Sequence, residues 1–505
     1  AKFEYGQLAR IGITMRNFQD TKLAAWLLQK HSSHLKALSR QMLDRDPITY
    51  DQVTQGRDMA DIPLEEVMEY GAADSDSTRM LWPTLKRELT EAKLWDVYEK
   101  VELPAIPVLH DMENKGVLVD VAAALEVLSD IDQAIEVAQE DIYQAGLPRS
   151  VSVTSTEQLS GALEKLGAPI TARTEAKKLL KTDETALEEA KAKGFMSDLV
   201  DSLLGYKSLV KTRAYIKSYV DLRGPDGRLH PQFVQAGEEE DRGTASDTDA
   251  APRTGRLSCR GPNLQNQPNR KGGDWTPRLR RCVLPTPGYQ LVAGDISQEE
   301  VRIAAYVTGE RRFLEAIRTG GNVYEVFAEG IYNKKVTKSS DPMAYNIGKQ
   351  SVLSFIWGSE GSRSWAPRLL ELDKEQGTGE LTLAAAKRAY SRLEKEFPDI
   401  PRWRQYVKET LYDKGYITDY FGRRRLLPGV YSMDRNQANA AWREGMNFLI
   451  QGPAGSVIKL AKRRVWEAIQ GKKAFLLLSI HDELVGEAAP EEIDNFARLL
   501  YTMTV

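Results

Sequence analysis

Apolar residues recur along much of the chain with the spacing of amphipathic helices. Within residues 1–99 this spacing predicts short helices, for example over 21–28 and 64–81. From residue 100 to 222 the runs are longer and predict an elongated helical section. Its helices are expected over residues 101–113, 121–144, 156–166 and 196–220.

Three ionisable residues in a row, His481-Asp482-Glu483, interrupt an apolar run that otherwise has the pattern of a buried strand. A charge inside such a strand costs several kcal/mol unless it is paired or bound to a metal. The triplet therefore either faces a cation or forms a hairpin turn that places it in water. These residues alone leave both interpretations open.

A second carboxylate ends another predicted strand. Residues 289–295 (YQLVAGD) form an apolar strand that ends at Asp295, a place where ligand sites are often built. A helix follows, and Ser297 and Glu300 fit a capping box, which is the structural alternative for that glutamate. If Asp295 and Asp482 meet, they supply the carboxylates that a two-metal phosphoryl-transfer site requires.

A helix with clear boundary signals lies between these two strands. Asp341 is its expected N-cap and Pro342 its first residue. Four residues recur every fourth position and share one stripe of the helix: Tyr345, Lys349, Leu353 and Trp357. Lys349 either binds a triphosphate, with Leu353 and Trp357 against a sugar and base, or extends to solvent from a buried face.

Charge is unevenly distributed along the 505 residues, although the net charge is only −3. Any role in nucleic-acid binding must therefore rest on local patches. An acidic stretch over residues 238–249 predicts a solvated, mobile loop. The basic block that follows is either a phosphate-contacting surface or a solvated face, and it consists of Arg253, Arg256, Arg260, Arg270, Lys271, Arg278, Arg280 and Arg281.

The ends and the cysteines bear on the cellular setting. Cys259 and Cys282 give no disulfide framework, which suits a reducing compartment, and no apolar stretch approaches the length of a membrane span. Residues 1–5 form neither a signal peptide nor a natural start, so we expect a chain cut at its N-terminus. The C-terminus also stops inside a predicted helix.

Seven motifs occur in one order along the chain. They are TGRLS (254–258), PNLQN (262–266), DISQEEVR (295–302), the helix of Lys349, FGRRR (421–425), NFLIQGPA (447–454) and HDE (481–483). This ordered set resembles the polymerase domain of family A, or polymerase I-like, DNA polymerases, over about residues 100–505.

The resemblance implies a mixed α/β, right-hand polymerase fold. The thumb is expected over residues 100–240, the first part of the palm over 241–335, the fingers over 336–430 and the second part of the palm over 431–505. Residues 1–99 would form part of a ribonuclease H-like 3′–5′ exonuclease domain.

The resemblance also assigns the palm residues. Asp295 and Asp482 look like its two metal-binding carboxylates, with the Ile296 carbonyl as a further ligand and Glu483 close by. Two Mg²⁺ ions are expected, and Mn²⁺ can substitute. Lys349 resembles the fingers lysine that contacts the phosphates of the incoming nucleotide and donates a proton to pyrophosphate.

Other positions resemble residues that hold the nucleotide and the DNA. Glu300 would crowd the 2′ position of the sugar and so exclude ribonucleotides. The nucleotide-binding set implied by the resemblance is Tyr345, Lys349, Leu353, Trp357, Glu300, Ile296, Gln298 and Tyr324. The DNA-binding set is Arg256, Asn263, Gln265, Arg443, Asn447, Gln451 and His481, of which His481 would contact the primer terminus.

Several positions depart from the family pattern. Tyr345 stands where an arginine that clamps the outer phosphate is common, and Leu353 stands where some members have a tyrosine that helps them accept dideoxynucleotides. We therefore expect discrimination against dideoxynucleotides. Tyr324 replaces a usual histidine and Ile296 a common tyrosine. Leu353 and Tyr324 suggest a phage enzyme, which would act in the host cytoplasm.

The N-terminal section carries a partial exonuclease signature. Tyr70 and Asp74 fit a Y-x-x-x-D motif in which the aspartate binds metal and the tyrosine orients water. Glu4 falls near another metal-binding position, but the preceding D-x-E motif is absent. A two-metal site without half of its carboxylates should not hold its ions. Proofreading is therefore expected to be absent or crippled in this chain, although a longer natural protein would have it.

The expected function is template-directed DNA synthesis by a DNA-directed DNA polymerase, a nucleotidyltransferase that acts on primer-template DNA and deoxynucleoside triphosphates. Replisome proteins such as a helicase-primase are possible partners, and a cytoplasmic monomer without membrane attachment is expected. The enzymatic alternative is a single-subunit RNA polymerase, against which Glu300 and TGRLS argue. A catalytically inactive DNA-binding or processivity protein would need neither Asp295 nor Asp482.

Overall fold

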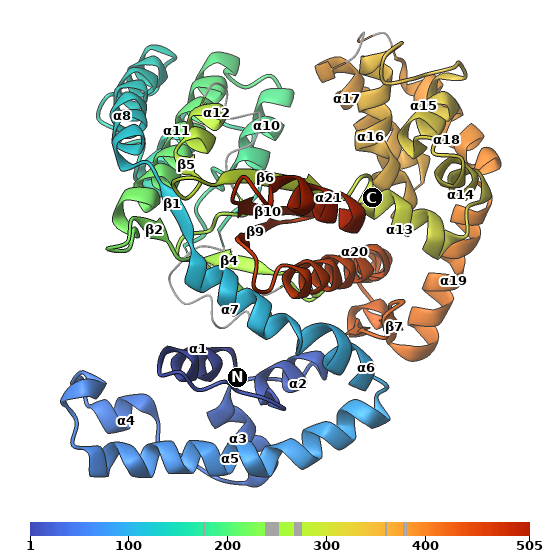
Figure 1. Ribbon diagram of the computed structural model, residues 1–505. Coiled ribbons are helices and arrows are strands. Elements are labelled where there is room, and N and C mark those ends of the chain that lie inside the picture. The colour runs from blue at the N-terminus through green and yellow to red at the C-terminus, as the bar shows by residue number, and fades with distance from the viewer. Residues whose placement is uncertain are drawn as a thin grey trace. The chain divides into compact units, whose positions relative to one another are not determined.

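The computed structural model describes residues 1–174, 177–237, 252–266, 275–358, 361–376, 379 and 381–504 (Figure 1). The chain divides into two compact units. The first unit consists of Ala1–Met112, Phe233–Ser258 and Val292–Val505, and the second of Glu113–Gln232 and Cys259–Leu291. The predicted acidic loop over 238–249 and two members of the basic block, Arg270 and Lys271, lie outside the described residues.

The second unit is a helical bundle with a small antiparallel sheet. Its strands β1 (Val117–Val119), β2 (Arg228–Leu229) and β5 (Val283–Leu284) pair in the order β2-β1-β5. The helices are α8 (Val121–Gln144), α9 (Thr156–Lys165), α10 (Glu184–Ala192), α11 (Ser197–Asp221) and α12 (Trp275–Arg281). Side-chain oxygens cap three of them, from Asp120 on α8, Ser155 on α9 and Asp183 on α10. Strands β3 (Gln232–Val234) and β4 (Ser258–Arg260) lie where the chain passes between the units.

The first unit begins with a group of helices. They are α1 (Lys2–Arg10), α2 (Thr21–Leu27), α3 (Leu35–Leu43), α4 (Tyr50–Thr54), the 3₁₀ turn η1 (Met59–Asp61), α5 (Leu64–Glu91), α6 (Trp95–Val97), the π-helical turn η2 (Tyr98–Glu102) and α7 (Ala105–Lys115). The helices predicted over 21–28, 121–144, 156–166 and 196–220 are confirmed with ends within one residue, whereas the helix predicted over 64–81 continues to Glu91. The helix predicted over 101–113 is wrong at its start, because a π-helical turn occupies residues 98–102 and α7 begins at Ala105.

A three-stranded sheet forms the centre of the C-terminal part of the first unit. Its strands β6 (Gln290–Asp295), β9 (Ala474–Ile480) and β10 (Glu483–Ala488) lie in the order β6-β10-β9. Three helices lie near this sheet: α13 (Glu299–Thr308), α20 (Arg435–Ala468) and α21 (Ile493–Thr504) (Figure 1). The buried strand predicted before the charged triplet is confirmed as β9, and the strand predicted before Asp295 as β6.

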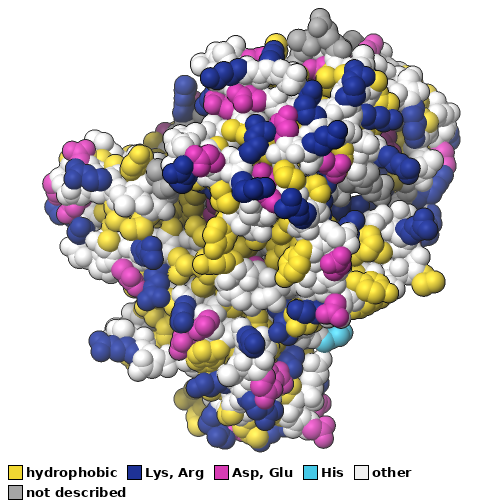
Figure 2. Space-filling model, turned by 90° about the vertical axis from the view of Figure 1, so that its right-hand side faces the viewer, with side chains coloured by type: hydrophobic (Ala, Val, Ile, Leu, Met, Phe, Trp, Pro, Cys, Tyr) yellow, Lys and Arg dark blue, Asp and Glu magenta, His cyan; other side chains and the backbone are white. Residues whose placement is uncertain are grey.

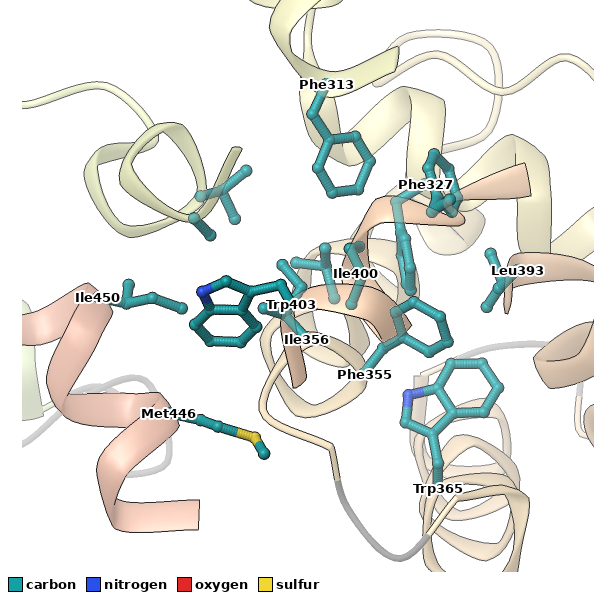
Figure 3. Close-up of a cluster of buried hydrophobic side chains, with 14 of the residues drawn as sticks. Phe313, Phe327, Phe355, Ile356, Trp365, Leu393, Ile400, Trp403, Met446 and Ile450 are labelled. Atoms are coloured by element: carbon teal, nitrogen blue, oxygen red, sulfur yellow. The ribbon is translucent and has the colours of Figure 1, made fainter. Parts of the chain in front are cut away.

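The remaining elements of the first unit are mostly helices that share one aromatic core. They are α14 (Arg311–Arg318), α15 (Val323–Tyr332), α16 (Pro342–Ile356), α17 (Ser362–Gln376), α18 (Leu383–Glu396), α19 (Asp399–Lys414), the hairpin β7 (Tyr416–Thr418) and β8 (Arg424–Leu426), and the 3₁₀ turn η5 (Pro428–Tyr431). Phe355 of α16 lies at the centre, with ring centroids 5.4 Å from Phe327 and 5.9 Å from Trp365 (Figure 3). Such ring contacts add to the free energy gained by burial and hold α16 against its neighbours.

Two features of the described residues bear on the broad class of protein. No helix among them combines the length and the apolar character needed to cross a membrane. On the face drawn in Figure 2, Lys and Arg side chains are interspersed with Asp and Glu rather than joined into one continuous basic surface. This agrees with the near-neutral net charge of the whole chain.

Candidate active site

Strands β6 and β10 bring the two aspartates of the sequence analysis together. β6 is hydrogen-bonded to β10, and the backbone N–H of Ile296 donates to the carbonyl oxygen of Asp482 over 3.0 Å. Burial and the negative charge of Asp482 raise the pKa of Asp295, whereas the positive charge of Lys349 lowers it. Asp295, Asp482 and Lys349 therefore lie within electrostatic reach of one another.

The charged triplet forms the turn of the β9–β10 hairpin. Glu483 pairs with Ile480, so His481 and Asp482 are the two turn residues. His481 adopts the left-handed conformation with φ 54°, which is unfavourable for a residue with a side chain and is tolerated mainly at turns and functional sites. His481 is exposed and Asp482 half-buried. The triplet is thus a turn, and the same turn presents Asp482 toward Asp295.

The capping box predicted from Ser297 and Glu300 does not form. Helix α13 begins at Glu299, and its N-cap Gln298 has a left-handed backbone with φ 56° and no capping hydrogen bond from its side chain. The Glu300 carboxylate instead accepts a hydrogen bond from Arg256 Nη2 over 2.5 Å. The Gln298 side-chain oxygen accepts one from the backbone N–H of Val323 over 3.1 Å. Glu300 and Gln298 therefore bond to residues outside α13, namely Arg256 and Val323, and do not cap the helix.

Glu299 is a buried carboxylate that the sequence analysis did not single out. It is 5% exposed, and its Oε1 has no hydrogen-bond partner among the described residues. Burial, and then the charge of Asp482, raise the pKa of Glu299 to about 8, against which Arg256 acts. No periodic pattern could have identified this residue, because it precedes the first apolar position of α13.

Helix α16 starts where it was predicted to start, and Lys349 on it is exposed. Asp341 is the N-cap, and its side chain accepts from the backbone N–H of Ala344 over 3.1 Å. Lys349 is exposed, and its Nζ lies 5.8 Å from the ring centroid of Tyr324. Exposure of Lys349 fits both interpretations, because a lysine that extends to solvent from a buried face also has an exposed ammonium group.

The other residues of the α16 stripe are more buried than Lys349. Tyr345 is buried and its hydroxyl accepts from Asn322 Nδ2 over 3.3 Å, while Leu353 and Trp357 pack half-buried against the aromatic core. Burial raises the pKa of Tyr324 to about 12, and the charges of Glu300 and the two palm aspartates act in the same direction. Tyr324 therefore neighbours Lys349 and Tyr345 of the stripe and lies within electrostatic reach of the carboxylates.

The carboxylates fit a divalent cation. Among the described residues no group of three or more His, Cys, Asp or Glu side chains has the arrangement of a preformed metal site. Burial and, after it, the negative charge of Asp482 raise the pKa of Asp295, and a bound cation would favour the ionised form of this carboxylate. Carboxylate and carbonyl oxygens are also the ligands that Mg²⁺ prefers. These two side chains and the Ile296 carbonyl are the groups that could hold it.

The family model described as DNA polymerase family A matches residues 122–504. The chain belongs to DNA polymerase family A. A second family model, described as a 3′–5′ exonuclease, matches residues 1–90 of this family A polymerase. The family and the mixed helical and sheet fold expected from the motifs are thereby confirmed.

The relatives of this family A polymerase are DNA polymerases I. That of Chloroflexus aurantiacus is 32% identical over 519 residues, which cover 99% of this chain and 51% of that protein. The thermostable DNA polymerase I of Thermus aquaticus is 30% identical over 445 residues, covering 86% of this chain and 48% of that protein. The chain spans about half the length of the curated relatives it matches. These relatives are bacterial, and the expected phage-type origin finds no support in them.

A solved structure extends the likeness to the whole chain. It is described as the POL domain of Pol1 from M. smegmatis in complex with DNA primer-template and dNTP. Its TM-score is 0.82 at 26% sequence identity, with 100% of this chain and 81% of that chain covered. The similarity therefore includes the residues that carry Asp295, Asp482 and Lys349.

The predicted DNA-contacting residues are distributed over both units of the polymerase. Arg443, Asn447 and Gln451 recur every fourth position on α20, and the Asn447 side-chain oxygen has no hydrogen-bond partner among the described residues. Arg443 also lines a cavity of about 240 Å³. Asn263 and Gln265 lie in the second unit, where the Asn263 side chain accepts from the Gln265 backbone N–H over 3.0 Å. Their contacts with DNA stay a prediction.

The exonuclease-like residues are tied to a lysine. Tyr70 and Asp74 lie on α5, and Lys36 of α3 forms an ion pair with Asp74. The same Lys36 Nζ lies 4.3 Å from the ring centroid of Tyr70. Glu4 lies on α1 with an exposed side chain that pairs with the amino group of Ala1. The positive charge of Lys36 thus pairs with the negative charge of Asp74.

Proposed function

We propose that this chain catalyses template-directed addition of deoxynucleotides to the 3′ end of a primer, with release of pyrophosphate. The observation that carries the proposal is the meeting of Asp295 and Asp482 at the hydrogen bond between Ile296 and the hairpin turn, with the charge of Lys349 acting on the same site. The primer-template and dNTP named for the M. smegmatis structure support the same substrates here. The chain is then a DNA-directed DNA polymerase.

Asp295, Asp482 and the Ile296 carbonyl would hold two divalent ions, for which Mg²⁺ is the expected metal and Mn²⁺ a substitute. When bound, these ions lower the pKa of the primer hydroxyl and stabilise the leaving oxygen. Glu483 neighbours the site on β10 and would tune it. His481, exposed in the turn, would contact the primer terminus.

The fingers helix would bind the nucleotide. Lys349 is exposed on α16, so its ammonium group can pair with the phosphates and donate a proton to pyrophosphate. Leu353 and Trp357 would pack against the sugar and base. Tyr345 replaces the usual arginine, and its buried hydroxyl is engaged with Asn322, so it would support the helix rather than clamp the outer phosphate.

Discrimination against ribonucleotides would depend on Glu300. Arg256 holds the Glu300 carboxylate, which fixes the place where that side chain would exclude a 2′-hydroxyl. Arg256, together with the α20 residues Arg443, Asn447 and Gln451, would contact the primer-template through groups common to every base pair. Gln298 and Tyr324 would complete the wall of the nucleotide site.

The assignment of thumb, palm and fingers to residue ranges is part of this proposal. The described structure divides the chain into two units, and the predicted thumb (100–240) overlaps the second unit over much of its length. The helices over 336–430 would be the fingers, and the segments 241–335 and 431–505 the palm. A helicase-primase partner, a monomeric state and a cytoplasmic location stay predictions.

Proofreading is proposed to be absent from the chain as given. The ion pair between Lys36 and Asp74 neutralises the only carboxylate of the Y-x-x-x-D motif. A nuclease site needs its carboxylates free to bind cations. No observation favours the RNA polymerase or the inactive DNA-binding protein, because the family A match and both palm aspartates argue against them.

Primer extension on a DNA template with Mg²⁺ tests the proposal. The wild type should incorporate deoxynucleotides and strongly prefer them to ribonucleotides. Asp295→Asn should lower the extension rate about 10³-fold or more, because a charge interaction of several kcal/mol with the reacting centre is lost. Asp96→Asn, on an exposed aspartate paired with Lys100, is the matched control and should leave the rate unchanged. Activity that survives Asp295→Asn would overturn the metal assignment.

A further inference from the structure

The first unit contains a cluster of buried charges that the proposed reaction does not use. Glu102, the last residue of η2, is fully buried, and both of its carboxylate oxygens lie 2.7 Å from Lys459 Nζ. Arg423 Nη2 donates to the same carboxylate, and Gln235 Nε2 donates to the Glu102 backbone oxygen over 2.9 Å. One carboxylate thus joins α20, the β7–β8 turn and the segment around residue 235.

The charges of this cluster depend on one another. Burial disfavours the ionised form of Glu102, but the charges of Lys459 and Arg423 outweigh it and lower its pKa. Burial lowers the pKa of Lys459 to about 8, and Glu102 acts in the opposite direction. Removing one partner of a buried ion pair leaves an uncompensated charge, which is far more disruptive than losing an exposed pair. The charges of Arg423 and Lys459 are therefore compensated by the same residue, Glu102.

Arg423 lies directly against the backbone of the TGRLS motif. A Cβ atom built on Gly255 would be 2.4 Å from Arg423 Cζ, and Gly255 has a φ of +82°, so this contact requires a glycine. On the side of α20, a Cβ on Gly455 would lie 2.9 Å from the backbone nitrogen of Arg256. The backbone of residues 255–256 is therefore held between Arg423 and α20.

The next side chain in this chain of contacts reaches the candidate active site. Arg256 follows Gly255 in sequence, and its guanidinium pairs with Glu300. A continuous series of contacts thus leads from the buried ion pair to the candidate active site. It runs through Glu102, Arg423, Gly255, Arg256 and Glu300. Coupling between distant residues travels through such packed and hydrogen-bonded series.

The N-terminal segment contacts strand β8, which follows Arg423 in the chain. Gln29 donates to the backbone oxygen of Arg424 over 2.6 Å and accepts from the backbone N–H of Leu426 over 3.1 Å. Arg424 Nη2 donates to the Ala92 oxygen over 2.9 Å. The ring centroid of Trp26 lies 5.7 Å from Arg423 Cζ. The exonuclease-like segment therefore braces the turn that carries Arg423.

We propose that Glu102 and Arg423 are positioning residues for the polymerase reaction, and that the N-terminal helices use this buried ion pair to fix Arg256 against the primer-template. The inference rests on the proposed function, in which Arg256 contacts the primer-template. It gives the segment at residues 1–102 a role in synthesis that needs no nuclease activity. Glu102 itself lies between the two regions that the family models match.

The substitution Glu102→Gln tests the proposal. It keeps the shape of the side chain but removes the charge that holds Arg423 and Lys459 together, so Arg423 and the adjoining Gly255 should shift. Displacements of about 1 Å in a positioning group cost up to about 100-fold in rate. We expect kcat/KM for a matched primer end to fall between about 10-fold and 100-fold, and that for a mismatched end to fall much less.

The measured quantity is the ratio of kcat/KM for matched and mismatched primer ends. Partial unfolding lowers both values equally and leaves their ratio unchanged, so the ratio separates positioning from a merely structural role. Glu99→Gln, on an exposed residue of the same turn, is the matched control and should keep the wild-type ratio. In an Arg256→Ala background, Glu102→Gln should cause no further change in the ratio.

A wild-type ratio in a folded, active Glu102→Gln protein would overturn the inference and leave the proposed function intact. If Glu102→Gln does not fold, Gly255→Ala decides instead, since its Cβ meets Arg423 without removing a buried charge. An unchanged ratio in that variant would equally overturn the inference. A wild-type chain that extends no primer would refute the proposed function and, with it, the role of Arg256.

Discussion

Replacing Glu299 by glutamine should stabilise the metal-free protein above neutral pH and change its pH-dependent stability little in mild acid. The carboxyl of Glu299 is 5% exposed and its pKa is raised to about 8 from the usual 4.5. In the unfolded chain it loses its proton near pH 4.5, whereas in the folded protein it stays protonated to about pH 8. The folded state therefore binds the extra proton throughout this interval.

The sign and size of the change in the free energy of unfolding follow from proton linkage. The stability contributed by the neutral form is complete below pH 4.5 and is lost as the pH rises toward 8, by about 1.4 kcal/mol for each pH unit. At pH 7 the loss amounts to about 3 kcal/mol, and at pH 8 to about 4 kcal/mol. Glu299→Gln removes this titration. An unpaired buried amide has its own cost, but that cost does not vary with pH.

Thermal unfolding in EDTA between pH 5.5 and 8.5 measures the effect. The Tm of Glu299→Gln relative to wild type should rise steadily across this range, while Glu65→Gln, on an exposed glutamate, should run parallel to wild type. Added Mg²⁺ should flatten the wild-type profile, because a cation at Asp295 and Asp482 favours ionised Glu299. Parallel profiles for Glu299→Gln and wild type in EDTA would refute the reasoning.

Three further predictions concern helix α16 and the N-terminal helices. The wild type should discriminate against dideoxynucleotides, and Leu353→Tyr should weaken that discrimination about tenfold by restoring a hydroxyl; equal use of both substrates by the wild type in competition assays would contradict this. Phe355→Ala should destabilise the protein by about 3–5 kcal/mol, since the ring is fully buried among other aromatic rings, and an unchanged Tm would show that the site collapses without cost. Finally, single-stranded DNA should not be degraded in Mg²⁺, and degradation that Asp74→Ala abolishes would show that Lys36 does not block the site.

Local sequence signals were sufficient where the structure depends on neighbouring residues. Asp341 and Pro342 mark the start of α16 because an N-cap and a first-turn proline act on the adjacent backbone. The periodic apolar positions of residues 121–144 give the observed bounds of α8 for the same reason. Where the backbone departs from regular geometry, such signals fail: the left-handed Gln298 moves the start of α13 and removes the capping box of Ser297.

The candidate site was predictable only in part. Asp295 stood out because it ends an apolar strand and Asp482 because it interrupts an apolar run, and the ordered motifs suggested that they meet. Glu299 and Glu102 carried no such mark, since a glutamate beside a helix start or in a polar run is ordinary in sequence. Their burial depends on side chains from segments hundreds of residues away, as Lys459 and Arg423 illustrate for Glu102.

The sequence by itself determined the family, the positions of most helices and the residues from which a two-metal site could be built. Only the tertiary structure decided that Asp295 lies beside the turn of Asp482, that Lys349 is exposed, and that Arg423 packs against Gly255. The physical reason is the distance along the chain over which each interaction acts. Capping and periodicity act over a few residues, whereas burial and electrostatic coupling depend on which distant segments pack together.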